Sequence, residues 1–384
     1  MSHFTFPPPP ASPEGETLRA EIRDFLAGEL ADRAPIDRAQ SWNGTDPAFS
    51  RKLGQRGWLG LTWPKRYGGH ERTALERYVL LEELLAAGAP VAAHWIAERQ
   101  SGPSILRFGT EAQRQAILPR IAAGECFFCI GMSEPDSGSD LASVRTRAVR
   151  EAGGWRVNGT KLWTTNAHIC HYMILFCRTG PVDPERRHAG TSQFLVDLTL
   201  PGITIRPVRF LTGEHHFNEV VFEDALLPED AILGREGEGW GQVTGELAYE
   251  RSGPERFLSS FQVLVELVRA LAASPPNERA EIALGRLGAQ LVTLRRMSRS
   301  VAGLLQAGAD PALEAAMVKD LGAMVEQEIP EIVRDLLADA PPTPASREIE
   351  RVVAYVTMHA PSFSLRGGTR EILRGIIARG LGLR

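Results

Sequence analysis

Two polar stretches in the middle of the chain combine residue types that suit a flat or phosphorylated ligand. The first, residues 131–140, is rich in Ser, Gly and Asp. Such a loop offers unpaired backbone N–H groups and hydroxyls, which bind anions. The second, residues 158–166, contains Trp163 followed by Thr164 and Thr165. It therefore places an aromatic stacking face beside two hydroxyls that form hydrogen bonds.

The elements that position these stretches follow from the hydrophobic pattern. Apolar residues recur at helical spacing in three early segments, Thr17 to Leu30, Ala74 to Ala87 and Thr110 to Ala123. Between Cys126 and Ile232 short β-branched or aromatic runs alternate with Gly and Pro, at 170–177, 193–197 and 202–206. The helical period returns after Gly241. Helices, then strands, then helices predict an α+β fold with segregated layers rather than a parallel α/β sheet.

A turn is expected inside the second polar stretch. Asn158-Gly159 lies between two apolar runs, and both residues tolerate the positive φ that a two-residue turn requires. The pair predicts a β-hairpin there.

Composition limits the classes of protein. A chain of 384 residues is long enough for two or three domains. The formal net charge of −4 and the lack of a basic run argue against a nucleic-acid partner. The sequence has no run of about 18 apolar residues, so no membrane span is predicted. The first ten residues lack the features of a signal peptide, and Pro7 to Pro10 predict a mobile, extended leader.

The four cysteines predict structural thiols rather than a disulfide or zinc site. They are Cys126, Cys129, Cys170 and Cys177. Cys126 and Cys129 fall in an apolar run in which side chains three residues apart face opposite sides. No second CxxC and no HExxH accompanies them, so we expect no metal site. Reduced thiols fit a cytoplasmic protein.

Further motifs accompany the two polar stretches in a fixed order. They are Trp58 to Pro64 with Tyr67-Gly-Gly69, Phe217 to Asp224, Leu233 to Trp240, and Gly367 to Arg374. Together with 131–140 and 158–166 they resemble the acyl-CoA dehydrogenase family over nearly the whole chain. No GxGxxG follows a strand, so a dinucleotide-binding Rossmann domain is not expected.

The resemblance implies an architecture and partners. It implies an N-terminal helical domain at 1–125, a central flavin-binding β-barrel or sandwich domain at 126–232, and a C-terminal four-helix bundle at 233–384. It also implies FAD as cofactor, an acyl-CoA substrate, and an electron-transferring flavoprotein as electron acceptor. Family members assemble as homo-oligomers, dimers or tetramers, or as heterotetramers with a related subunit.

The resemblance also assigns the flavin contacts. It places residues Ile130 to Ser139 along the cofactor, with Met132 and Ser133 at the isoalloxazine edge and Ser139 near the pyrophosphate or the pantetheine arm of the substrate. Donors at that edge stabilise negative charge on the reduced ring. Trp163 covers one face of the ring, and Thr164 and Thr165 lie near N5. Thr369 and Glu371 match positions that meet the adenosine half of FAD.

The catalytic base departs from the common family pattern. Many members carry a Glu immediately before Gly-Thr in the closing motif, where this chain has Gly367. A minority, isovaleryl-CoA dehydrogenase among them, carry the base as Glu-Arg on the first long C-terminal helix. This chain has Glu250-Arg251 at the matching place. We therefore expect Glu250 to be the base and Arg251 to position it or the substrate.

Three other carboxylates compete for the role of base. Glu246 lies one helical turn before Glu250. Glu255 follows Gly253-Pro254, which bends or ends the helix, and Glu371 belongs to the closing motif.

Two other functions stay open. Gly367 and the missing Arg-x-x-Phe-Gly motif at 277–287 allow a non-catalytic or half-catalytic subunit of a heteromeric dehydrogenase. A flavin monooxygenase or oxidase on the same fold is the third hypothesis.

Overall fold

The computed structural model describes residues 4–338 and 344–383, except for the side chains of residues 246–250 and 344–346. The chain forms two compact units, and neither is a continuous stretch of sequence. One unit contains residues 45–71 and 91–247. The other contains the described residues up to 44, residues 72–90 and the described residues from 248 onward. The order of helical, β and helical segments along the chain is as the hydrophobic pattern predicts.

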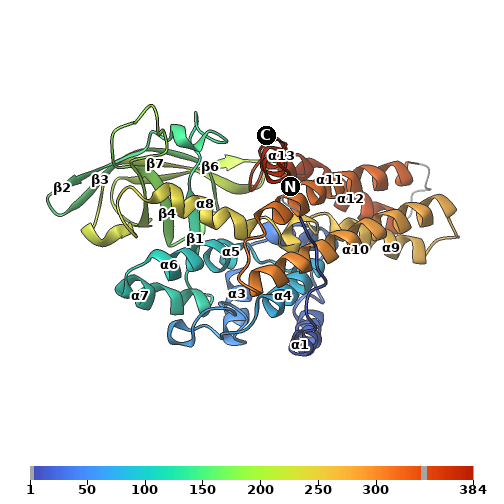
Figure 1. Ribbon diagram of the computed structural model, residues 1–384. Coiled ribbons are helices and arrows are strands. Elements are labelled where there is room, and N and C mark those ends of the chain that lie inside the picture. The colour runs from blue at the N-terminus through green and yellow to red at the C-terminus, as the bar shows by residue number, and fades with distance from the viewer. Residues whose placement is uncertain (1–3, 339–343, 384) are drawn as a thin grey trace. The chain divides into compact units, whose positions relative to one another are not determined.

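The first unit is built on one mixed sheet of eight strands (Figure 1). The strands are β1 (Phe128–Gly131), β2 (Arg147–Glu151), β3 (Gly154–Thr165), β4 (Tyr172–Arg178), β5 (Thr191–Asp197), β6 (Ile203–Arg209), β7 (His215–Leu227) and β8 (Ile232–Leu233). Their spatial order is β6-β7-β3-β2-β4-β5-β8, and β1 lies beside β4. Strand β4 pairs in parallel with β1 and β2 and antiparallel with β5. The two polar stretches of the sequence thus lie directly after β1 and in β3.

Alternation along the strands buries one core on each face of this sheet. Trp155 and Phe194 meet edge to face, with ring centroids 5.1 Å apart, in a cluster that includes Cys129. Cys126 and Phe128 belong to a separate cluster. Cys126 and Cys129 therefore face different cores, as the strand period requires. No group of three metal-ligating side chains occurs in the described part of the chain.

Helices complete this first unit. They are α3 (Pro47–Gln55), α5 (Ala92–Ile96), a π-helical turn (Ala97–Ser101), α6 (Gly102–Phe108) and α7 (Glu111–Ala122), and α8 (Gly239–Glu250) begins in it. Helix α7 starts at a capping box, in which Thr110 and Gln113 satisfy each other's backbone N–H groups. Trp63 and Tyr67, from the early aromatic motif, are buried with Phe128. That motif therefore supports the strand that leads into the polar loop.

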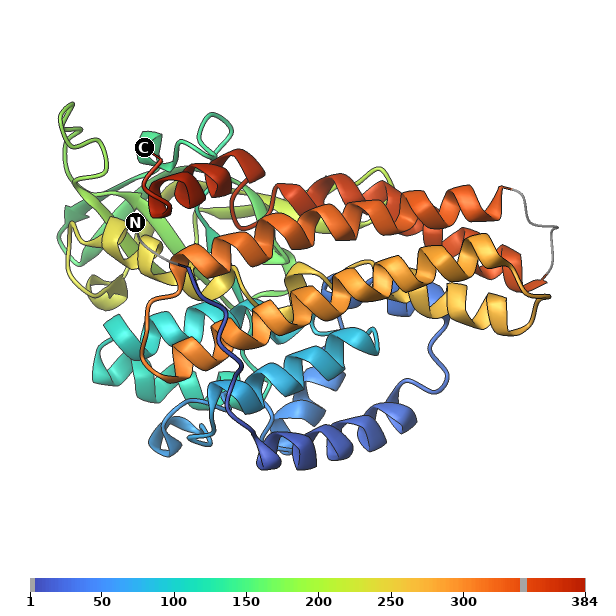
Figure 2. The ribbon, with the colours of Figure 1, turned by 45° about the vertical axis from the view of Figure 1, so that its right-hand side comes forward.

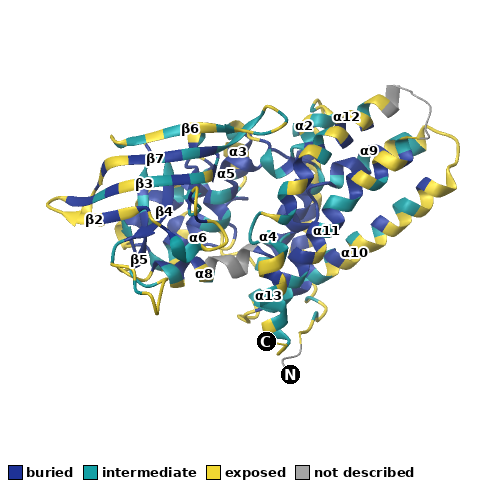
Figure 3. Ribbon diagram, turned by 90° about the horizontal axis from the view of Figure 1, so that it is seen from above, coloured by how far each residue is buried: buried dark blue, intermediate teal, exposed yellow. Residues whose placement is uncertain are grey.

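The second unit is helical. It contains α1 (Pro13–Glu29), α2 (Pro35–Ala39), α4 (Ala74–Ala86), α9 (Phe261–Ala272), α10 (Glu278–Gln306), α11 (Ala312–Leu337), α12 (Pro344–His359) and α13 (Arg370–Gly380). Helices α9 to α12 pack as a bundle of four (Figure 2). The exposed stripe of α10 and its buried opposite side show the amphipathic period (Figure 3).

The proline-rich start forms no helix or strand, and it packs against the helices instead of forming the mobile leader that the sequence predicts. Phe6 packs on a buried cluster that contains Val301 and Val318. Pro9 and Pro10 lie close to Gly303 of α10, where an added Cβ would meet them at about 3.4–3.5 Å. The segment runs along the helical unit (Figure 2).

The predicted hairpin at Asn158-Gly159 is wrong. These residues lie inside β3, which is continuous from Gly154 to Thr165, and they form a bulge against β7. Gly159 has φ of 146°, and a Cβ there would come within 2.8 Å of Thr146. The Asn158 side chain exchanges two hydrogen bonds of 2.9 Å with Asp224 of β7. The positive φ that suggested a turn is used for a bulge instead.

Among the described residues, no helix has both the length and the apolar character needed to cross a membrane.

Candidate active site

The polar loop after β1 is fixed by β3. The backbone N–H of Leu162 donates to the Ser133 carbonyl at 2.9 Å. The Lys161 ammonium donates to the Met132 carbonyl at 3.0 Å. Ile130, also a predicted flavin contact, is half-buried in β1 and pairs with Ile174 of β4. The structure therefore brings Ile130, Met132 and Ser133 beside the strand that carries the Trp-Thr-Thr sequence.

Trp163 is presented outward by an unusual backbone. Its φ is 61°, in the left-handed region that large residues rarely adopt. The ladder between β3 and β7 slips between Lys161 and Thr164, which marks a second bulge. The indole is 53 % exposed and rests edge to face on Phe217, with centroids 5.8 Å apart. One face of a large aromatic ring is thereby left open at the sheet surface.

The two threonines after Trp163 differ in environment. Thr164 is 1 % exposed, and its hydroxyl has no hydrogen-bond partner within the described part of the chain. Thr165 is half-buried and pairs with Phe217 of β7. An unsatisfied buried hydroxyl costs free energy unless a ligand or water pairs with it.

Asn218 is a site residue to which no role was assigned from the sequence. It is fully buried, and its amide donates to the Thr164 carbonyl at 3.0 Å. It also lies 2.7 Å from Nε2 of His215 and 3.3 Å from Nδ1 of His168. The two imidazoles stack with centroids 4.1 Å apart. Burial, and then His215, lower the pKa of His168, which favours the neutral ring.

The far end of the polar loop faces solvent. Ser139 is exposed, and its neighbour Asp140 accepts from Ser143 at 2.5 Å and from Arg187 at 2.7 Å. Ser139 therefore lies on the same loop as Met132 and Ser133, at its open end.

The closing motif forms a turn before α13. Gly367 and Gly368 have φ of 65° and 96°, which glycine adopts without a Cβ penalty. The Thr369 hydroxyl accepts from the backbone N–H of Ile372 at 3.5 Å and caps α13. Glu371 is exposed in the first helical turn. A backbone hydrogen bond and the Thr369 hydroxyl lower the pKa of Glu371, so its carboxylate stays ionised.

Residue 251 meets this closing motif. Arg251, which is buried, directly follows the end of α8, and its Nε donates to the Gly367 carbonyl at 3.4 Å. The side chains of Glu250 and Glu246 lie outside the described residues. The backbone nevertheless brings the end of α8 next to residue 367.

Two further buried acids near the motif are held by arginines. The Glu255 carboxylate lies 3.7 Å from Arg256, and both side chains are nearly inaccessible to solvent. Glu326 pairs with Arg366 at 2.9 Å and accepts from the backbone N–H of Ser259 at 2.8 Å. Burial lowers the pKa of Arg366 to about 10, but the guanidinium stays charged at neutral pH. These ion pairs hold the turn that carries Gly367.

The predicted site residues thus form two groups. Residues 130–139 and 163–165 lie together in the sheet unit, and residues 251, 367, 369 and 371 lie together in the helical unit. The sheet group fits a flavin: an open indole face, a buried unpaired hydroxyl and a loop whose carbonyls are fixed by β3 suit a planar polar ring.

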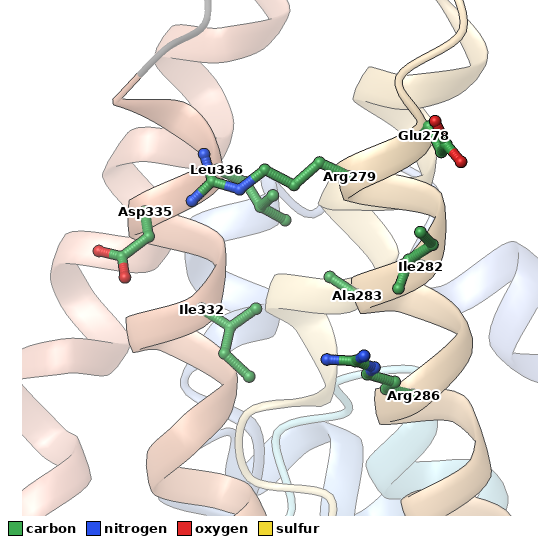
Figure 4. Close-up of a pocket in the computed structure, with 8 residues that line it drawn as sticks. All are labelled: Glu278, Arg279, Ile282, Ala283, Arg286, Ile332, Asp335 and Leu336. Carbon is green, nitrogen blue, oxygen red and sulfur yellow. The ribbon is translucent and has the colours of Figure 1, made fainter.

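A groove elsewhere in the helical unit takes no part in either group. It has a volume of about 480 Å³ and lies between α10 and α11 (Figure 4). Its lining includes Arg279, Ile282 and Arg286 of α10 and Ile332, Asp335 and Leu336 of α11. None of the predicted site residues lines it, so cavity size alone does not locate the chemistry.

Comparison with known proteins agrees with the motifs. Family models match in chain order: acyl-CoA dehydrogenase N-terminal domain at 12–125, middle domain at 129–225 and C-terminal domain at 237–382. Acyl-CoA dehydrogenase FadE29 of Mycobacterium tuberculosis (strain ATCC 25618 / H37Rv) is 32 % identical, and the match covers 96 % of each chain.

Solved structures show the same fold. The Tcur3481-Tcur3483 steroid ACAD superposes with a TM-score of 0.85 at 26 % identity, over 97 % of this chain and 98 % of the other. The ChsE4-ChsE5 complex from Mycobacterium tuberculosis gives 0.83 at 30 % identity, over 98 % and 99 %. The chain therefore belongs to the acyl-CoA dehydrogenase family and is an FAD-dependent oxidoreductase.

Proposed function

We propose that the chain oxidises an acyl-CoA thioester to the trans-2-enoyl-CoA, with Glu250 as the base. The carboxylate of Glu250 takes the α-proton, and a hydride leaves the β-carbon. When bound, FAD would supply the hydride acceptor at N5, and an electron-transferring flavoprotein would receive the two electrons. The protein provides orientation, electrostatics and one base.

The observation that carries this assignment is the contact between Arg251 and Gly367. Their hydrogen bond of 3.4 Å brings the end of α8 to the closing motif. In the common family pattern the base stands at 367, where this chain has no side chain. The backbone at the end of α8, where residue 250 stands, lies close to that position, and this favours Glu250 as the base.

The other acids suit the role less well. The Glu255 carboxylate already lies 3.7 Å from the Arg256 guanidinium, which competes with a substrate for it. The pKa of Glu371 is lowered, and its exposure leaves it without the desolvation that strengthens a base. Glu246 is the remaining rival, because it shares a face of α8 with Glu250.

In this proposal the sheet group would bind the flavin ring. Trp163 would stack on one face of the flavin ring, and Thr164 and Thr165 would lie at its N5 side. Ile130, Met132 and Ser133 would meet the isoalloxazine edge. Ser139 would meet the pyrophosphate or the pantetheine arm, and Arg251 the substrate. Thr369 and Glu371 would meet the adenosine half of FAD.

Anaerobic reduction of the FAD-loaded protein by a panel of acyl-CoAs tests the proposal. Glu250→Gln should bind substrate but reduce flavin about 10²–10⁴-fold more slowly, which is the usual contribution of a general base. Glu246→Gln is the matched control on the same helix and should react nearly as fast as the wild type. Normal flavin bleaching in Glu250→Gln, or loss in Glu246→Gln alone, would remove Glu250 from the role.

A heteromeric enzyme is the second candidate, and two observations favour it. Two of the similar structures carry two protein names each: the Tcur3481-Tcur3483 steroid ACAD and the ChsE4-ChsE5 complex. In addition, Gly367 leaves this chain without the common base. Co-expression with a related chain, followed by measurement of FAD per assembly, tests it. A stable complex whose activity exceeds that of either chain alone would support it, and full activity of this chain by itself would oppose it.

Substrate class and oxygen reactivity can be tested in the same experiment. The panel should include straight, branched and steroid-derived thioesters, because the steroid ACAD is among the similar structures. After reduction, the peroxide yield in air separates a dehydrogenase, which protects its reduced flavin, from an oxidase or monooxygenase.

A further inference from the structure

A lysine lies fully buried beneath the loop that follows β1. Its side chain is 0 % exposed, in the middle of β3. Its ammonium donates to the Met132 carbonyl at 3.0 Å and to Oε1 of Glu134 at 2.8 Å. A buried ammonium is tolerated only when its charge and its N–H groups are paired. The Lys161 ammonium thus binds to two residues of this loop.

Glu134 carries the connection to the other end of the loop. Its two carboxylate oxygens accept from the backbone N–H groups of Arg145, at 2.7 Å, and Thr146, at 2.9 Å. A pair of backbone hydrogen bonds between Glu134 and Ser137 closes a tight turn. Lys161 and Glu134 therefore tie the start of the loop at Met132 to its return into β2.

The Lys161 ammonium and the Glu134 carboxylate form an ion pair at 2.8 Å, and each affects the pKa of the other. Burial lowers the pKa of Lys161, and Glu134 opposes that effect. Burial acts to raise the pKa of Glu134, but Lys161 and the surrounding donors outweigh it, so the net pKa is below its ordinary value. The pair is neutral as a whole, whereas each member alone is an uncompensated buried charge.

The bond from Lys161 links Met132 to this pair. Glu134 lies on the predicted flavin-binding loop, but the contacts assigned there are to Ile130, Met132, Ser133 and Ser139. The Ser133 carbonyl is held separately, by the Leu162 N–H at 2.9 Å. Two independent hydrogen bonds from β3 thus fix the backbone at 132–133. One of them is donated by Lys161, which is a member of the ion pair.

We propose that Lys161 and Glu134 are positioning residues for FAD: they hold the backbone of Met132, next to Ser133, at the flavin edge and keep the net charge beneath it at zero. The inference rests on the proposed assignment of Met132 and Ser133 to the flavin. Neither member touches the reacting atoms. Both act through the loop backbone and through the field that they create below it.

Opposite shifts of the flavin midpoint potential distinguish this role from a merely structural one. Lys161→Met leaves the negative charge of Glu134 beneath the loop, which disfavours the negatively charged reduced ring and lowers the potential. Glu134→Gln is nearly isosteric, keeps an acceptor for one backbone N–H, and leaves the positive charge of Lys161, so it raises the potential. Lys161→Met also frees the Met132 carbonyl, and the dissociation constant for FAD should rise about tenfold or more.

The experiment measures the FAD dissociation constant, the midpoint potential and the melting temperature of both variants. Arg19→Met is the matched control, because Arg19 is a buried cation of α1 that pairs with Glu82 of α4, in the helical unit. It should lower the melting temperature without changing the potential. Wild-type potentials in both loop variants, with only the melting temperature lowered, would overturn the inference. A wild-type protein that takes up no FAD would instead overturn the cofactor assignment and the inference with it.

Discussion

Placing a carboxylate back at residue 367 should not restore a base to this chain. Gly367 has φ of 65°, where an L-residue costs roughly 1–2 kcal/mol. A Cβ built there would lie 3.0 Å from a terminal nitrogen of Arg256 and 3.3 Å from its Cζ. Gly367→Glu therefore adds backbone strain and brings a carboxylate against a guanidinium.

The guanidinium decides what the new carboxylate does. Arg256 is 4 % exposed, so an ion pair with it is poorly screened by water. An opposite charge within about 4–6 Å lowers a carboxyl pKa by roughly 1–3 units. The carboxylate added by Gly367→Glu would thus be a weaker base than a desolvated glutamate, and it would point toward Arg256 rather than toward the substrate.

The assay is anaerobic flavin reduction by acyl-CoA in Glu250→Gln and in the double variant Glu250→Gln, Gly367→Glu. We expect the double variant to stay as slow as Glu250→Gln. Gly367→Ala separates strain from charge, because it adds a Cβ but no carboxylate. Its melting temperature should fall by about as much as that of Gly367→Glu.

Recovery of most of the wild-type rate in the double variant would refute the reasoning, because it would show that Arg256 does not hold the added carboxylate. Adding Arg256→Gln to the double variant gives the converse check. If the ion pair is what blocks function, this triple variant should react faster than the double variant.

Three more measurements test other parts of the structure. Asn218→Ala removes the buried donor to the Thr164 carbonyl and should cost about 1–3 kcal/mol of unfolding free energy and weaken FAD binding; an unchanged urea midpoint would contradict this. Burial lowers the pKa of His94 from about 6.5 to about 4, so the unfolded state binds the proton first and stability is lost as pH falls from about 6.5 toward 4. His94→Gln should lose less stability over that range, by up to roughly 3 kcal/mol, and equal slopes for variant and wild type would exclude the effect. Phe6→Ala should cost about 1–2 kcal/mol, because Phe6 is partly buried against α10 and α11; a free leader would show no change in melting temperature.

The sequence predicts the helices and strands of this fold well where neighbouring residues specify them. Helices α4 and α7 and strand β5 lie within a few residues of the predicted ranges, because helix caps and alternating apolar residues are encoded in neighbouring positions. The Asn158-Gly159 turn fails for the opposite reason. Whether a Gly with positive φ makes a turn or a bulge depends on β7, about 65 residues later, through the Asn158–Asp224 pair.

The same distinction between local and distant determinants applies to the residues of the candidate site. Motifs in the sequence locate Met132, Trp163 and Gly367, because each stands in a short block of characteristic residues. Lys161 and Asn218 stand in quoted motifs too, but no role follows from the sequence. Their partners come from other strands or loops, and only the fold brings them together. Strand β3 also carries Arg156 and Asn158, so a lysine at 161 does not stand out in the sequence as a buried charge.

The strain in the sheet unit supports the placement of the flavin on β3. Of the five described non-glycine residues with left-handed φ, three lie in or beside the β3–β7 pair: Trp163, Asn166 and Asp224. Each such residue costs about 1 kcal/mol or more and persists only where its surroundings enforce it. Asp224 is held by Asn158, and the carbonyl next to Trp163 by Asn218. Hydrogen bonds on both sides of Trp163 hold its backbone in the left-handed region and keep the indole at the surface. Without them, the backbone would relax out of this region. Folding gives little reason for this state, because the indole is 53 % exposed; the proposed stacking of a planar ligand on the indole would give one.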